Sequence, residues 1–235
     1  MKNKTLWTDT EGKPIQAHGG MILQHKGIYY WYGENKDTET VNRHVDFIGI
    51  SCYSSEDLEN WRNEGIVLSP VVNNPAHMLY TKNICERPRV LYNKSTKQFV
   101  MYTHADTADY YYAGVNVAVA ASPTGPFVWL KSFQPNRQDS RDMTLFQDLD
   151  GSAWLIHSAN YNKTMNIARL SDDYLDVTGS YISIFQDQER EAPAIMYSHN
   201  RYYMITSGCS GWEPNPSLYG ICDHLIGPWK LIDNP

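Results

Sequence analysis

Residues 27–34 read GIYYWYGE, a short aromatic run bounded by glycine, and the same pattern recurs three more times along the chain. The later copies are QFVMYTHAD at residues 98–106, SAWLIHSAN at 152–160 and RYYMITSGC at 201–209. Short runs rich in aromatic and β-branched residues, set between Gly, Asn, Asp and Ser, are typical of β-strands. No stretch carries a helical hydrophobic period, so the sequence indicates an all-β fold.

Each aromatic strand stands at the same place in a larger unit. A strand and a tight turn precede it, as in GGMILQHKG at residues 19–27 and RPRVLYNKSTK at 87–97. A third strand follows, and three of the units close with a similar outer strand, such as GPFVWLKSF at 125–133. Four units of about 50–70 residues predict four-stranded blades in radial repetition, a β-propeller. A β-sandwich is the structural alternative, but it does not predict this unit-by-unit correspondence.

Composition and charge exclude several classes of function. The chain has 235 residues, enough for one well-cored domain, and a formal net charge of −6, which argues against a nucleic-acid partner. No apolar run approaches the roughly 20 residues that cross a bilayer. The start, MKNKTLWTDT, has no apolar segment of the kind that secretory signals carry. We therefore expect no membrane partner and no signal peptide, and the compartment stays open.

Four cysteines and two histidines have unremarkable sequence settings. Cys52, Cys85, Cys209 and Cys222 show no CxxC spacing and no metal-ligand grouping, so we expect buried free thiols. His104 and His157 each lie within an aromatic strand and are interpreted as core or hydrogen-bonded histidines. The stretch YNKT at residues 161–164, although it matches a glycosylation pattern, is interpreted as a turn.

The innermost strand of each propeller blade lines the central channel, so the residue just before that strand should lie at the channel mouth. The four units place these residues there: His18 in AHGG, Glu86 in CERPRV, Asp142 in RDMTLF and Glu191 in EAPAIM. Ionisable side chains are costly to bury, so packing alone does not explain such a set. We expect these residues to converge on one site.

Converging carboxylates suggest two kinds of chemistry. Glycoside hydrolysis with inversion needs a protonated acid and a base roughly 6.5–9.5 Å apart, with a water between them. Neighbouring carboxylates raise one another's pKa and so keep the acid protonated. A structural Ca²⁺ is the alternative, although no metal-ligand motif supports it, and no cofactor is required for hydrolysis. Taken singly, Glu86 beside Arg87 and Arg89, or Glu191 beside Arg190, could also be a salt-bridged rim residue.

An ordered set of motifs resembles glycoside hydrolase family 43, and within it the exo-β-1,3-galactanase branch. The motifs are WTDTEGKPIQAHGG, YYWYGENK, ISCYSSEDLENW, ICERPRVLYN, SRDMTLFQDLDG, REAPAIMY and SGCSGWEPNP. The resemblance runs over essentially the whole chain and implies a five-bladed β-propeller and an inverting mechanism. Residues 1–235 would then form one catalytic domain with about four of the five blades present. It also implies a family that is typically secreted or periplasmic.

The resemblance assigns roles to three carboxylates. Glu191 in EAP matches the general acid that protonates the leaving oxygen. Glu86 in CERP matches the carboxylate that tunes this acid and holds the sugar. Asp142 in SRD matches a further carboxylate of the sugar-binding subsite.

Other positions match the part of the galactanase branch that contacts the terminal galactose. Glu34 in YGEN and Tyr110 in DYYY fall where that sugar is held. Three residues of GCSGWEPN fall on the loop that borders the subsite, namely Cys209, Trp212 and Asn215. Trp212 is interpreted either as a stacking platform for sugar or as a core plug between blades.

The sequence departs from the family in two places. Most of the family has a general-base Asp at the entrance to the first blade, whereas this chain reads IQAHGG, in which neither Gln16 nor His18 is a carboxylate. The galactanase branch also lacks that Asp and is thought to use a Gln from the fifth blade. Here the sequence ends at LIDNP, just after the outer strand of the fourth unit, so we expect the last blade to be lacking. His18 is retained as a substrate-binding residue and an alternative base, and association that covers the missing blade is a further expectation.

The function that these observations favour is exo-acting, inverting hydrolysis of β-1,3-galactan or a related plant polysaccharide, with release of galactose. One alternative is an α-L-arabinofuranosidase or β-xylosidase of the same family, although the missing first-blade Asp counts against it. The other is a carbohydrate-binding propeller without catalysis, which would bind the sugar and not turn it over.

Overall fold

The structure, a computed structural model, describes residues 5–42, 44–211 and 213–232. This part of the chain contains strands β1 to β18 and a single 3₁₀ turn, η1 (Pro135–Arg137), which confirms the all-β prediction. No helix among these residues is long and apolar enough to cross a membrane. Their contacts divide the chain into two compact units, one formed by the residues up to 112 together with 116–132, the other by 113–115 and the residues from 133 onward.

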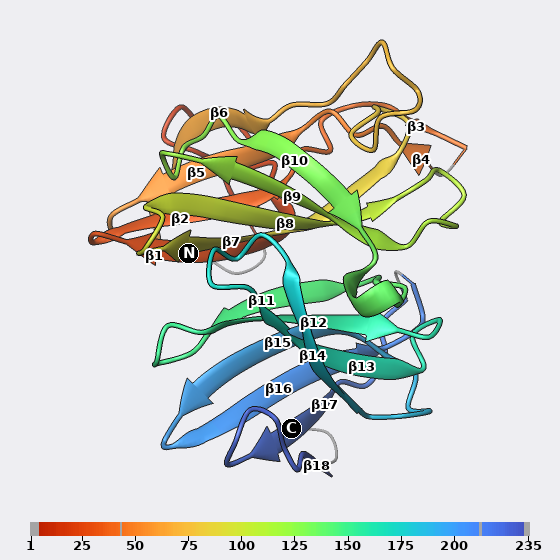
Figure 1. Ribbon diagram of the computed structural model, residues 1–235. Coiled ribbons are helices and arrows are strands. Elements are labelled where there is room, and N and C mark those ends of the chain that lie inside the picture. The colour runs from red at the N-terminus through yellow and green to blue at the C-terminus, as the bar shows by residue number, and fades with distance from the viewer. Residues whose placement is uncertain (1–4, 43, 212, 233–235) are drawn as a thin grey trace. The chain divides into compact units, whose positions relative to one another are not determined.

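The first unit contains two four-stranded antiparallel sheets (Figure 1). Blade 1 has the strand order β1 (His18–His25), β2 (Ile28–Glu34), β5 (Ile50–Ser55) and β6 (Arg62–Leu68). Blade 2 runs from β7 (Ile84–Asn93) through β8 (Gln98–Asp106) and β9 (Gly114–Ala120) to β10 (Val128–Phe133). A short hairpin of β3 (Thr40–Val41) and β4 (His44–Val45), which the sequence did not predict, lies between β2 and β5 along the chain.

The second unit repeats this plan. Blade 3 has the order β11 (Met143–Gln147), β12 (Ala153–Ala159), β13 (Thr164–Leu170) and β14 (Val177–Ile184). Blade 4 has β15 (Arg190–Ser198), β16 (Arg201–Gly208), β17 (Leu218–Cys222) and β18 (Lys230–Ile232). The four predicted sequence units are thus four separate sheets, each with the predicted aromatic strand in second place. This arrangement confirms the propeller prediction. It excludes the β-sandwich alternative, because a sandwich would have two sheets.

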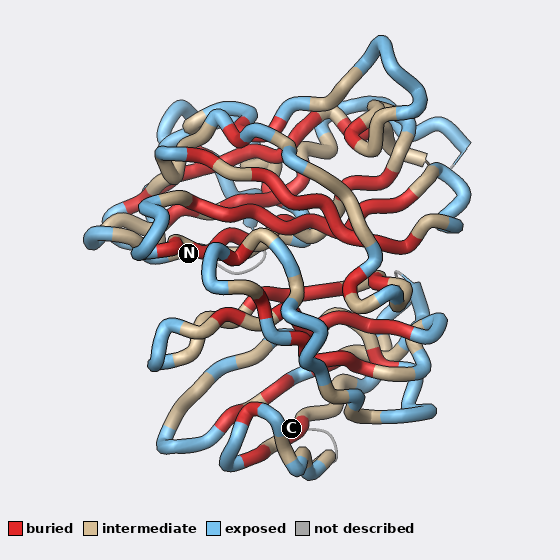
Figure 2. The backbone as a smooth tube through the Cα atoms, viewed as in Figure 1, coloured by how far each residue is buried: buried red, intermediate tan, exposed pale blue. Residues whose placement is uncertain are grey.

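The aromatic strand β2 is apolar on both faces because each face meets a different core. Tyr30 and Tyr32 point into the core that blades 1 and 2 share, where they pack with residues such as Val90 and Met101. Trp31, on the opposite face, lies with its ring 5.3 Å from that of Trp61. Side chains alternate between the two faces of a strand, so a strand buried on both sides carries aromatics at successive positions. Long buried, red segments in Figure 2 belong to strands such as β8 in blade 2 and β12 in blade 3.

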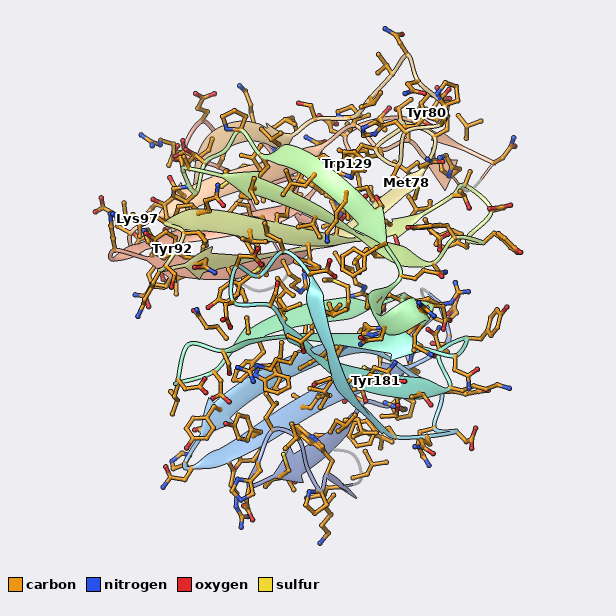
Figure 3. All side chains as sticks on the ribbon, in the orientation of Figure 1. Met78, Tyr80, Tyr92, Lys97, Trp129 and Tyr181 are labelled. Carbon is orange, nitrogen blue, oxygen red and sulfur yellow. The ribbon has the colours of Figure 1, made fainter. Side chains whose placement is uncertain are left out.

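The outer strand of blade 2 is tied to the loop that precedes the blade. The ring of Trp129 on β10 (Figure 3) lies 4.4 Å from that of His77. Its indole nitrogen donates to Oδ1 of Asn116 at 3.1 Å.

In the second unit, a separate core around Met165, Ile167 and Met204 joins blades 3 and 4. In each unit, as far as the structure describes it, an apolar core therefore lies between the two sheets.

His157 lies inside the second unit, on β12 opposite Met143, and is completely buried. The backbone of Ser158 and the charge and backbone of Asp139 favour its charged form, but burial outweighs them. Burial lowers the pKa of His157 to about 4, because the charged imidazolium loses its hydration.

This buried histidine predicts a loss of stability in acid. The unfolded chain takes up a proton on His157 below its ordinary pKa of 6.5, whereas the folded chain takes it up only near 4. The unfolded state therefore binds more protons in this range, and the free energy of unfolding should fall by about 2–3 kcal/mol between these pH values. Urea unfolding followed at several pH values measures it.

The substitution His157→Gln should flatten that pH dependence, since the titrating group is gone. His199→Gln is the matched control, because His199 is exposed on the turn between β15 and β16 and should leave the slope unchanged. Equal slopes for the wild type and His157→Gln would contradict the assignment.

Candidate active site

The first strands of blades 1, 2 and 4 share an irregularity. In each, two residues of the first strand lie opposite one residue of the second strand, which is a β-bulge. The residues at which the bulges begin are His18, Glu86 and Glu191. Across from them, on the second strands, lie Glu34, His104 and Ser207. The sequence prediction that these first-strand residues hold equivalent positions in their blades agrees with this register.

The residue after each of these positions has a left-handed backbone. Gly19, Arg87 and Ala192 have φ of 56°, 51° and 52°. For the two residues with a side chain this conformation costs on the order of 1 kcal/mol each. A bulge bends the strand and re-aims the side chain beside it, and such strain clusters at functional sites. Because the bulge lets pairing continue beyond it, Glu86 and Glu191 lie inside β7 and β15 and not just before them.

In blade 3 the paired residues of β11 and β12 are in regular register, and the corresponding position lies just before β11. The carbonyl oxygen of Asp142, one residue before β11, accepts a hydrogen bond of 2.9 Å from the backbone N–H of Ser158. The N–H of Arg141 in turn donates to the carbonyl of Ser158 at 3.0 Å. Asp142 therefore lies across from Ser158 at the end of the blade's first strand, partly exposed.

In the first unit, Glu34 is a buried carboxylate, 6% exposed, that two groups hold in place. Its Oε1 accepts from the backbone N–H of Arg87 at 3.1 Å, and its Oε2 pairs with Nζ of Lys36 at 2.7 Å. Gly19 approaches this carboxylate closely, since an added Cβ would lie 2.7 Å from Oε1 of Glu34. Glycine at this bulge therefore avoids the backbone strain that Arg87 and Ala192 carry, and it leaves room for the carboxylate.

Glu34 and Glu86 influence each other's protonation. Burial and the charge of Glu86 raise the pKa of Glu34, although Lys36 opposes them. Burial would also raise the pKa of Glu86, but His104, Lys36 and Tyr110 together hold it below its ordinary value. The two carboxyls titrate as a pair in which Glu86 ionises first and Glu34 retains its proton more strongly.

Tyr110 lies where the sequence placed it, next to the carboxylates of the first unit. Its hydroxyl donates to Oε1 of Glu86 at 3.3 Å, and its backbone is left-handed with φ of 58°. Burial and the charge of Glu86 raise the pKa of Tyr110, so the phenol stays protonated and acts as a donor. Its side chain is 44% exposed, which leaves part of the ring open to a ligand.

His18 begins β1 and contacts Gln16, the other residue of IQAHGG that was considered in place of the missing Asp. Its Nε2 lies 3.1 Å from Oε1 of Gln16. Burial and the charge of Lys36 lower the pKa of His18, so the imidazole is neutral at pH 7. A neutral imidazole can accept a proton, which is the state that a general base needs.

In the second unit, Glu191 has a neighbour that the sequence did not reveal. Nδ2 of Asn162 lies 3.5 Å from Oε2 of Glu191, and the hydroxyl of Ser207 lies 3.5 Å from the backbone carbonyl of Glu191. Asn162 belongs to the YNKT stretch and has a left-handed backbone, with φ of 65°. The turn interpretation was confirmed, but nothing in the local sequence indicated that this turn reaches the next blade's first strand.

Cys209 lies near Glu191, whereas Asn215 bonds to the loop that follows β16. The thiol of Cys209 donates to the carbonyl of Glu189 at 3.2 Å, and burial together with the charge of Glu191 raises its pKa to about 11. Asn215 bonds the loop itself, with Oδ1 2.6 Å from the N–H of Gly208 and Nδ2 3.0 Å from its carbonyl. The recorded contacts of Asn215 thus brace the loop after β16. Trp212 lies outside the described residues.

The cysteine prediction is partly wrong. All four thiols are free, and Cys52, Cys85 and Cys222 are buried as expected. Cys209 is exposed, because it follows β16 in the loop and not inside a strand.

The donors that a calcium site would need are not gathered in the described residues. They contain no group of three or more His, Cys, Asp and Glu side chains placed to hold a metal ion. The carboxylates of the first unit instead pair with cations of the protein, Glu34 with Lys36 and Glu86 with His104. This arrangement does not fit a hard cation, so no step of the chemistry is assigned to one.

Comparison with known proteins identifies the family. The family model of glycosyl hydrolases family 43 matches residues 19–233. A β-1,3-galactosidase of this family, solved with galactodeoxynojirimycin, is 38% identical with a TM-score of 0.94, and the match covers 100% of this chain and 81% of that one. No match was found among curated proteins.

Two further solved structures are similar over almost the whole of this chain. An exo-β-1,3-galactanase from Phanerochaete chrysosporium, solved with galactose, is 38% identical with a TM-score of 0.91, covering 99% of this chain and 53% of that one. An exo-β-1,3-galactanase from Clostridium thermocellum is 38% identical with a TM-score of 0.90, covering 99% and 51%. This chain therefore spans about half the length of these two galactanases.

The family model matches nearly all of the sequence, and the blade register around Glu86 and Glu191 agrees with the order of the sequence motifs. The chain therefore belongs to glycosyl hydrolase family 43 and is a glycoside hydrolase.

Proposed function

We propose that this glycoside hydrolase is an exo-acting β-1,3-galactanase that releases terminal galactose by inversion. The observation that carries the proposal is the 38% identity, over the full chain, to a β-1,3-galactosidase solved with a galactose-like inhibitor. The galactanase relatives solved with galactose and with β-1,3-galactotriose support the same sugar and linkage. Substrate and stereochemistry are both part of the proposal.

In the proposed reaction Glu191 is the general acid. Its carboxyl proton passes to the glycosidic oxygen as the bond from that oxygen to the anomeric carbon breaks. A water attacks the same carbon from the opposite face and gives up a proton to a base. The amide of Asn162, 3.5 Å from Oε2 of Glu191, supports this role because it orients the carboxyl group. His18, which is neutral, is the candidate base that the described residues offer.

The first unit is proposed to hold the sugar. Glu86 is ionised and offers lone pairs to sugar hydroxyls, and Glu34 is a second carboxyl group of this unit, which Lys36 and the N–H of Arg87 hold in place. Tyr110 adds a phenol whose ring is partly exposed. In the second unit, the family resemblance assigns Asp142, one residue before β11, to sugar binding as well. Such mixed donors and acceptors suit a polyhydroxylated ligand.

The substrate assignment is tested by product analysis. Purified protein is incubated with β-1,3-galactan, with β-1,3-galactotriose, and with the aryl α-L-arabinofuranoside and β-xyloside that an alternative specificity would cleave. We expect galactose as the first product of the galactan, with no larger oligosaccharide early in the reaction. Turnover of only the arabinoside or xyloside would replace the proposed specificity, and binding of galactotriose without any product would indicate a carbohydrate-binding protein.

The acid assignment is tested by Glu191→Gln. An amide cannot donate the required proton, so kcat on galactotriose should fall by roughly 10²–10⁴-fold while the sugar still binds within a few-fold of the wild-type affinity. Glu189→Gln is the matched control, since Glu189 is an exposed carboxylate two residues away on the same segment. If both variants kept the wild-type rate, Glu191 would not be the acid.

A further inference from the structure

We infer that His104 and Asp106 form a buried dyad that positions Glu86 and keeps it ionised for its contact with the sugar. The inference deepens the proposed function, since it rests on Glu86 acting in the sugar site. His104 was expected only to be a core or hydrogen-bonded histidine. In the structure it joins two carboxylates, and neither His104 nor Asp106 belongs to the motifs that carried the family resemblance.

The geometry places the imidazole of His104 between two acids. Nε2 lies 3.3 Å from Oδ2 of Asp106, and Nδ1 lies 3.5 Å from Oε2 of Glu86. His104 is 3% exposed and Asp106 is fully buried. The contact with Glu86 is an ion pair across neighbouring strands, longer than a well-aligned hydrogen bond. Both ring nitrogens therefore face an acidic oxygen.

The local strand structure explains why the dyad forms. His104 and Asp106 are two residues apart on β8, so their side chains point to the same face of the sheet. Glu86 stands directly across from His104 on β7, at the start of the bulge. Asp106 is fixed in turn, because its Oδ1 accepts from the backbone N–H of Thr107 at 2.9 Å. The contacts thus run from Thr107, just after β8, through Asp106 and His104 to Glu86, the residue proposed to bind the sugar.

The charges around His104 agree with a charged imidazolium. Burial alone would lower the pKa of His104, but the two carboxylates outweigh it and raise the pKa to about 9. Lys36, from the segment after β2, acts on Glu86 together with Tyr110. Cys85, the neighbour of Glu86 on β7, has a pKa raised to about 12 and stays a neutral thiol. Asn116, from β9, is neutral.

His157 shows that burial is not the cause of this charge. It is as buried as His104 and also lies on the second strand of its blade, yet the residue across from it is Met143. Asp139 and the backbone of Ser158 favour the charged form of His157 too weakly to offset burial, so its pKa falls to about 4 where that of His104 rises. The difference between the two histidines therefore comes from Glu86 and Asp106.

The dyad gives Glu86 a fixed orientation as well as a charge. Oε2 faces His104, and Oε1 accepts from the hydroxyl of Tyr110. A carboxylate held at both oxygens has few rotamers left and presents its remaining lone pairs in set directions. His104 and Asp106 are then positioning residues, which act on the sugar through Glu86 and do not touch it.

The first test is the charge state of His104, read by ¹H–¹⁵N NMR of the imidazole rings in the wild-type protein. We expect His104 to be doubly protonated at pH 7.5 and to lose its proton near pH 9, while His157 is neutral in the same spectrum. This measurement needs no substrate and no variant. A neutral His104 at pH 7.5 would overturn the inference, whatever the enzyme hydrolyses.

The second test is the pH profile of kcat/KM for Asp106→Asn, which keeps the shape of the side chain and removes its charge. We expect the pKa of His104, read by NMR, to fall by about one unit or more. The acid limb of kcat/KM should then move to a pH higher by roughly half a unit to one unit, because Glu86 loses its neighbouring cation. Asp223→Asn, an exposed carboxylate in blade 4, is the control and should leave both unchanged.

These readouts separate the inference from the proposed function. No turnover of galactan by a protein whose His104 is charged would contradict the function and leave the dyad standing. Normal turnover with an acid limb that Asp106→Asn does not move would contradict the dyad and leave the function standing. His104→Gln should reproduce the shifted limb, since its amide can still contact both acids but carries no charge.

Discussion

The bulges in the first strands of blades 1, 2 and 4 are the constraint on which the site depends. Each one inserts a residue just after His18, Glu86 or Glu191, and so turns that side chain away from the regular alternation of its strand. The rest of each sheet is ordinary antiparallel pairing over an apolar core. The blades therefore form the scaffold, and one residue with a left-handed backbone in each bulge orients the neighbouring side chain of His18, Glu86 or Glu191.

Burial of acids in the first unit is balanced by cations from the same unit. Three carboxylates, Glu34, Glu86 and Asp106, are met by Lys36 and His104. The pKa directions of two of them differ: burial and the charge of Glu86 raise the pKa of Glu34, whereas His104 helps to hold the pKa of Glu86 below its ordinary value. Two chemically identical side chains thereby acquire different affinities for a proton. The imidazolium of His104 matters most for this division.

Much of the fold could be predicted from the sequence because blade strands repeat their aromatic pattern and their turns. The hairpin Thr40–Val41 with His44–Val45 was missed because two-residue strands have no periodicity to detect. The equivalence of His18, Glu86 and Glu191 followed from their place in each unit, but the bulges did not, since they depend on pairing with the next strand. Asn162 and His104 were missed as site neighbours for a related reason: each reaches its carboxylate across strands, and local sequence does not record such contacts. The exposure of Cys209 likewise depends on where β16 ends.

The central claim is that a single displacement releases galactose, and the configuration of the sugar at the moment of release tests it most directly. ¹H NMR of the wild-type protein mixed with β-1,3-galactotriose can follow the anomeric protons before mutarotation mixes them. The account predicts that galactose appears first as the α-anomer, since one attack by water on a β-linkage inverts the carbon. Galactose that appears first as the β-anomer would mean two displacements through a covalent intermediate and would contradict the roles assigned to Glu191 and Glu86.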